Sequence, residues 1–156
     1  MTEEDILKLR DSAEQTRVQF KERVTSDNKY DVSCEMTALS NSHGGMVVVG
    51  INDKTGDINP LSYQEVQETT NMLGSLASEG VVPQILIDTE TIAVDGGNLV
   101  VATIKVGLNK PYHDSNGIVW VKQSSDKRKV FDNAELAEMA GVQLIRQTGD
   151  TVCSID

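Results

Sequence analysis

Long apolar runs and secretion signals are both missing from this sequence of 156 residues. A membrane-spanning helix needs about 18 or more consecutive apolar residues, and no such run occurs. The first ten residues, MTEEDILKLR, lack the basic start and following apolar stretch of a signal peptide. We therefore expect a chain that makes no contact with a membrane.

Cysteine is also scarce. Cys34 and Cys153 are far apart in the chain, and neither belongs to a Cys/His pattern with metal-ligand spacing. This argues against a structural metal motif built on cysteine. A reduced, cytoplasmic protein is the simplest expectation.

Positively charged residues are also scarce: the sequence has 14 Lys and Arg but 24 Asp and Glu, which gives a net charge of −10. A domain that held nucleic acid over its whole surface would normally be basic. Nucleic-acid binding by this acidic chain would therefore need a local basic patch or the help of another domain. The densest basic stretch is Lys122, Lys127, Arg128 and Lys129, placed at the end of a strand and in the following loop. It can be a phosphate-binding patch or merely a solvated loop.

The apolar spacing predicts a single α+β domain over residues 1–150, with a mixed sheet of about five or six strands. Helices are predicted over residues 3–10, 31–41 and 63–77, and a last one is predicted to open at Asp132 with Glu135 in a capping pattern. Strands are predicted over residues 16–21, 46–51, 85–87, 91–94, 99–106 and 117–122. The tail DTVCSID stops abruptly, so residues 151–156 are expected to begin a truncated downstream region.

A glycine pair stands between the second predicted helix and the apolar strand that follows. Phosphate-binding loops have the opposite order, with glycines after a strand and before the positive N-terminal end of a helix. The pattern therefore predicts a tight helix-to-strand turn formed by Asn41, Gly44 and Gly45.

Acidic residues and histidines provide the other candidate chemistry. Four carboxylates could converge on Mg²⁺ or Mn²⁺ if the strand at 16–21 lies beside the strand at 46–51, or they could be solvated surface; they are Glu14, Glu22, Glu35 and Asp53. His43 ends a helix, and His113 precedes Asp114 in a loop. No serine or cysteine nucleophile accompanies them, so a hydrolase triad is not supported.

The combination of these segments resembles the Schlafen/AlbA-like family of domains, to which DNA binding is ascribed. The resemblance rests on Glu14, the V-Q-F-K strand at 18–21, the A-L-S-N-S-H-G-G block at 38–45, G-I-N-D at 50–53, K-P-Y at 110–112 and V-W-V-K-Q-S-S at 119–125. It implies an N-terminal nucleic-acid-binding domain of bacterial transcriptional regulators or helicase-related ATPases, with further domains following. Some Schlafen relatives cleave RNA at a three-carboxylate metal site, whose positions here are Glu14, Gln19 and Asp53.

Two positions depart from the family pattern. Gln19 stands where the family commonly has Glu, which removes a charge from the metal site, and Lys122 stands where Arg is common. We therefore expect a non-catalytic regulatory domain without a cofactor, which binds DNA or RNA weakly and in a salt-sensitive way. The expected phosphate contacts are Arg17, Lys21, Lys110, Lys122, Lys127, Arg128 and Lys129. The alternatives are a metal-dependent ribonuclease that uses Mg²⁺ or Mn²⁺ at Glu14 and Asp53, and an interaction module that forms a homodimer.

Overall fold

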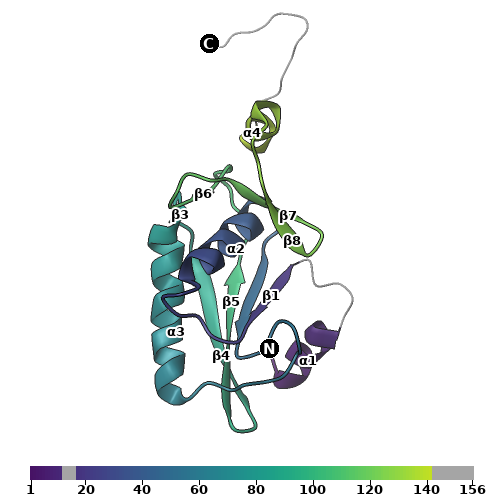
Figure 1. Cartoon of the computed structure of the whole chain (residues 1–156), viewed down its shortest axis with the longest axis vertical. Helices are drawn as coiled ribbons and strands as arrows, with labels where there is room; N and C mark the ends of the chain where they lie inside the picture. The colour runs from purple at the N-terminus through teal and green to yellow at the C-terminus, as the bar shows by residue number, and fades with distance from the viewer. Residues whose placement is uncertain (12–16, 142–156) are drawn as a thin grey trace, which may run out of the picture.

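The computed structural model describes residues 1–11 and 17–141 (Figure 1). In chain order the elements are α1 (Glu3–Asp11), β1 (Val18–Lys21), α2 (Lys29–Asn41), β2 (Gly45–Val49), α3 (Tyr63–Ser75), the π-helical turn η1 (Leu76–Gly80), β3 (Val81–Val82), β4 (Ile87–Val94), β5 (Gly97–Ile104), β6 (His113–Asp114), β7 (Trp120–Gln123), β8 (Asp126–Lys129) and α4 (Asn133–Met139). None of the helices in this part of the chain is long and apolar enough to cross a membrane.

The main sheet has four strands in the order β1-β2-β5-β4. β1 runs parallel to β2, with Gln19 opposite Val47, and the other pairs are antiparallel. The parallel pair is connected through α2, as a parallel crossover requires. The predicted neighbourhood of the strands at 16–21 and 46–51 is thus confirmed.

The helices cover the two faces of this sheet unequally. α2 and α3 lie across one face, where they enclose the larger apolar core, and α1 lies near the other face and buries Ile6 there (Figure 1). Every residue of α2 from Val32 to Asn41 is buried, because the sheet, η1, β6 and the β7–β8 hairpin all pack against this helix. α2 therefore links the sheet to the hairpin that carries most of the predicted basic residues.

The α+β fold with a mixed sheet is confirmed, and its strands divide between the four-stranded sheet and the two-stranded pairs β3–β6 and β7–β8. The predicted loop after the Trp120 strand is wrong, since Asp126–Lys129 form strand β8. Asp132 caps α4 as predicted, but Glu135 does not return the bond of a capping box. Gln143 and Leu144, which the apolar spacing also predicts for the last helix, and the region 151–156 lie outside the described residues.

The glycine pair forms a tight turn between α2 and β2. Gly44 has φ +74°, a left-handed conformation in which an L side chain is strained, and its amide donates to the Leu39 carbonyl at 2.8 Å. A Cβ on Gly45 would collide with the backbone carbonyl of Arg17. Gly44 thus allows α2 to terminate, and Gly45 allows β1 to approach β2 at the same place.

Candidate nucleic-acid interface

The β7–β8 hairpin divides the basic stretch between its two faces. Directly opposed residues of an antiparallel pair share a face, and here Trp120 opposes Lys129 while Lys122 opposes Lys127. By this register these four residues share one face, from which Lys122 and Lys127 reach Glu35 of α2, and Val121 and Arg128 share the other face. A sequence run of four cations therefore does not make one continuous patch.

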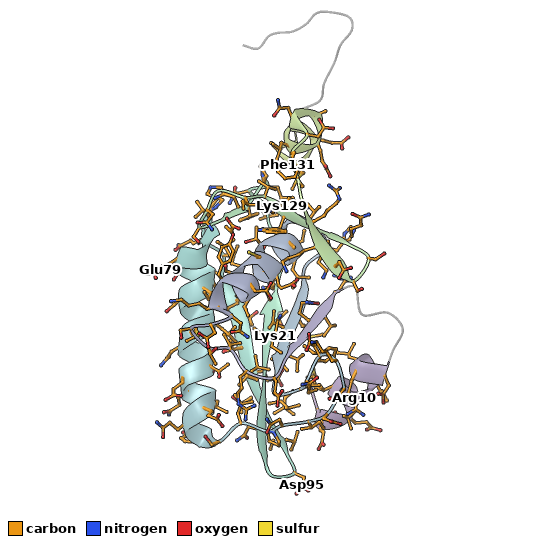
Figure 2. All side chains as sticks on the ribbon, in the orientation of Figure 1. Arg10, Lys21, Glu79, Asp95, Lys129 and Phe131 are labelled. Atoms are coloured by element: carbon orange, nitrogen blue, oxygen red, sulfur yellow. The ribbon has the colours of Figure 1, made fainter. Side chains whose placement is uncertain are left out.

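Three of the predicted phosphate-binding lysines lie against two carboxylates of α2. Lys21 Nζ and Lys127 Nζ each lie 2.8 Å from an oxygen of Asp31, and Lys127 Nζ is also 3.0 Å from Glu35 Oε2. Lys122 Nζ is 3.8 Å from Glu35 Oε1 and has only 7% of its side chain exposed. Figure 2 shows Lys21 at the centre of the molecule and Lys129 at the end of the hairpin. We call Lys21, Asp31, Glu35, Lys122 and Lys127 the ion network.

Burial and pairing compete in setting the pKa values of the ion network. Burial by itself would raise the pKa of Asp31, but hydrogen bonds from Lys127 and Lys21 outweigh it and lower the pKa. Burial likewise opposes charge on Lys127, yet its bonds to Asp31 and the charge of Glu35 raise its pKa. Lys122 differs, because burial lowers its pKa more than Glu35 raises it. Lys127, with two carboxylate partners, is therefore more strongly paired than Lys122.

The variant Lys127→Met should lose roughly 2 kcal/mol of the free energy of unfolding, with little effect on nucleic-acid affinity. It removes the ammonium group, whose Nζ lies 5.5 Å from the centre of the Trp120 ring, and it leaves the buried Glu35 without its hydrogen-bonded cation. Urea unfolding followed by the fluorescence of the single tryptophan measures the loss. Lys129→Met is the matched control, since Lys129 also lies over Trp120 but is exposed. Equal stabilities of the two variants would contradict a structural role for the network.

Cations from four separate segments line a hollow of about 510 Å³ between the end of α2, the hairpin and α4; they are Arg17, Lys110, Lys122 and Arg128. Arg17 donates to the carbonyl of His43, and Lys110 Nζ lies 3.4 Å from the carbonyl of Ser42. Both cations therefore sit at the negative end of α2, which favours positive charge there. The structure thus gathers the predicted cations at two places: Arg17, Lys110, Lys122 and Arg128 line the hollow, and Lys21, Lys122 and Lys127 belong to the ion network.

Asn41 fixes the loop and the strand that form this hollow. Its side-chain amide donates to the carbonyls of Tyr112 and Trp120 at 2.9 and 2.7 Å, and its oxygen accepts from the Tyr112 amide at 2.7 Å. All three bonds join residues about 70 to 80 positions apart in the sequence. Asn41 is thus more than a turn residue, because it ties the end of α2 to β7.

Asp114, which the sequence presents only as a neighbour of His113, anchors the same region from inside. It is fully buried, and its Oδ2 accepts from the Tyr30 hydroxyl at 2.6 Å and from Trp120 Nε1 at 2.8 Å. Its Oδ1 accepts from the amides of Asn116 and Ile118. Burial would raise the pKa of Asp114, but these bonds together lower it to about 2. The carboxylate is therefore charged at neutral pH and holds Trp120 in place.

The predicted carboxylates are engaged separately. Glu22 accepts from Asn52 and Asn59, Glu35 belongs to the ion network, and Asp53 is exposed in a turn that also contains Lys54. Gln19 is half-buried in β1, and Glu14 lies outside the described residues. Within residues 1–11 and 17–141, no group of three His, Cys, Asp or Glu side chains could hold a metal ion.

Comparison with known proteins places the chain in a family. The model of the family described as Schlafen, AlbA_2 matches residues 14–131. The chain belongs to the Schlafen AlbA_2 family. The match begins at Glu14 and includes the glycine turn, Asn41, Asp114 and the β7–β8 hairpin, but it ends before α4.

Two solved structures share the fold of this Schlafen AlbA_2 domain. The DIP2311 protein from Corynebacterium diphtheriae has a TM-score of 0.61 and 19% identity, over 81% of this chain and 28% of its own. The N-terminal domain of a protein from Nitrosomonas europaea, named as related to the RecG DNA helicase, has a TM-score of 0.59 and 21% identity, over 85% and 96%. The chain thus spans less than a third of the first and nearly all of the second. No curated protein matches it.

Asp31, the partner of Lys21 and Lys127, is not among the residues predicted from the sequence. A usable signal is present, because Asp31 and Glu35 are four residues apart and so share a helix face. The cations that would pair with this face are Lys122 and Lys127, which oppose each other on β7 and β8. Their pairing can be predicted only if residues 126–129 are recognised as a strand.

Proposed function

We propose that this Schlafen AlbA_2 domain binds nucleic acid through the cationic hollow and acts as a regulatory, non-catalytic module. The observation that carries the proposal is the convergence of Arg17, Lys110, Lys122 and Arg128 in a chain of net charge −10. Phosphate contacts need such a local concentration of positive charge when the rest of the surface repels DNA and RNA. The nucleic-acid association of the family supports the same conclusion.

The cations contribute unequally in this proposal. Arg17, Lys110 and Arg128 line the hollow, and Lys129 is exposed beside it on the hairpin, so these four supply the main phosphate contacts. Lys21 and Lys127 are within 3 Å of carboxylate oxygens, so they contribute chiefly by structure: Lys127 holds the hairpin on α2, and Lys21 holds β1 on α2. No side chain is assigned to base reading. We therefore expect dissociation constants of about 1 µM or weaker at physiological salt, typical of contacts with the backbone alone.

The setting of the domain is part of the proposal. The Corynebacterium protein is more than three times as long as the aligned region, which supports a domain that works within a longer chain. A buried free thiol at Cys34 supports the cytoplasmic location expected from the sequence.

Substitution of both Arg17 and Lys110 by Ala should weaken binding about tenfold or more at low salt, because two phosphate contacts are lost. Fluorescence anisotropy with a labelled hairpin RNA and a labelled duplex DNA, at about 50 and 200 mM salt, measures the affinity. The slope of log K against log salt should become shallower by about 1.5, since each contact contributes roughly 0.7 to 0.9.

The double variant Lys8→Ala/Lys54→Ala is the matched control, because it removes two exposed cations that do not line the hollow. Similar losses in the two double variants would contradict binding at the hollow.

A denaturing gel with Mn²⁺ present tests the other functions: cleavage that Asp53→Ala abolishes would make the domain a nuclease. No binding at any salt, with a concentration-dependent dimer, would make it an interaction module.

A further inference from the structure

We propose that α4 is an acidic gate, whose carboxylates occupy the cationic hollow in place of phosphate and must leave before nucleic acid binds fully. This inference rests on the proposed function and adds a regulation of the same site. Its basis is that the walls of the hollow carry both signs of charge: the cations come from the Schlafen AlbA_2 domain, and Glu135 and Glu138 come from α4.

Arg128 and Glu135 form the closest contact between the gate and the hollow. Both guanidinium nitrogens Nη1 and Nη2 donate to the two carboxylate oxygens, at 3.2 and 2.6 Å. This two-pronged arrangement is the one in which Arg also binds a phosphate group. Glu135 therefore holds the donors of Arg128 that a phosphodiester would use.

Glu138 adds a second carboxylate to the part of α4 that occupies the hollow. It lies three residues after Glu135, on the same face of α4, and both side chains line the hollow together with Met139. Two carboxylates on one helix face thus share the hollow with Arg17, Lys122 and Arg128.

In the part of the chain that the structure describes, α4 packs loosely on the rest of the fold. It buries no residue of its own, and Phe131, which precedes it, is 81% exposed (Figure 2). The family match ends at residue 131, before α4 begins. An exposed ion pair contributes little to stability, so a nucleic acid that releases several counterions can displace the helix.

The double variant Glu135→Gln/Glu138→Gln in the full 156-residue chain should bind a labelled hairpin RNA about three- to tenfold more tightly than the unmodified chain at low salt. Because Arg128 becomes available, the slope of log K against log salt should steepen by about 0.7 to 0.9. Glu68→Gln/Glu79→Gln on α3 and η1 is the matched control: it makes the same change in net charge away from the hollow. It should leave the salt slope unchanged.

Hydrogen exchange provides an independent measurement of the same event. The amides of α4 should exchange faster when RNA is added to the unmodified chain, since displacement removes the helix from its ion pair. Equal affinities and slopes of the two double variants, or slower exchange of α4 with RNA, would overturn the gate while leaving the proposed binding intact. Absence of RNA binding in every variant at low salt would overturn both.

Discussion

Asp114→Asn should lower the free energy of unfolding by roughly 3 kcal/mol, and Tm by roughly 6 to 12 °C. Asn has nearly the shape of Asp, but its amide nitrogen cannot accept a hydrogen bond. In one orientation that nitrogen faces the Trp120 and Tyr30 donors, and in the other it faces the amides of Asn116 and Ile118. Either orientation leaves buried donors without an acceptor. Thermal unfolding followed by circular dichroism measures the effect.

Asp88→Asn is the control for this substitution, because Asp88 is exposed and lies 4.0 Å from Lys105. It should change stability by less than about 0.5 kcal/mol. Similar losses for Asp88→Asn and Asp114→Asn would mean that the buried carboxylate is not the anchor of the β6–β7 region.

Lowering the pH should reduce the difference in the free energy of unfolding between the unmodified chain and the Asp114→Asn variant. The pKa of Asp114 in the fold, about 2, lies below its ordinary value of 3.8, so the fold prefers the charged form. The resulting stabilisation is complete above about pH 4 and is lost as the pH falls toward 2. Unfolding measured at several pH values between 2 and 6 should show the two free energies approaching each other at the acid end.

Gly45→Ala should destabilise the protein by roughly 2 to 3 kcal/mol. The added methyl group would collide with the carbonyl oxygen of Arg17 and lie close to the Leu39 side chain. That carbonyl also accepts from the Met46 amide at 2.8 Å, so it cannot move without weakening the pairing of β1 with β2. Urea unfolding of the variant measures the loss.

Gly74→Ala is the control of opposite sign. Gly74 is exposed within α3, and a Cβ there has no heavy atom within 4 Å. Since Gly is a poor helix former, Ala should stabilise the protein by about 1 kcal/mol. If both glycine variants gained stability, the close approach at Gly45 would not constrain the fold.

Local patterns in the sequence are sufficient for most of the elements. The apolar spacing at 31–41 and the continuous run at 46–51 predict α2 and β2, because burial requires those periods. The order of the helix end and glycines identifies the turn at Gly44. Three strands escape prediction. β3 and β6 are only two residues long, which is too short to show an apolar period, and Asp126–Lys129 of β8 is almost entirely charged and has no apolar alternation.

The candidate site is predictable only in part. Arg17, Lys110 and Arg128 are found from composition and from the family pattern, but their convergence follows from the paths of three separate segments. Lys21 and Lys127 are predicted to contact phosphate, and the structure places both against Asp31. Charge density along a chain cannot distinguish these cases, because it omits which side of a strand each residue occupies.

The sequence by itself determined the secondary structure of the core, the family pattern and the acidic balance of this protein, since each depends on residues close together in the chain. Only the tertiary structure decided which cations face solvent and which are neutralised. The reason is that the partners are distant: Asp31 on α2 meets Lys127 on β8, 96 residues later. Such pairs form only after the sheet, α2 and the hairpin have packed together, and that packing assigns each lysine to the ion network or to the surface.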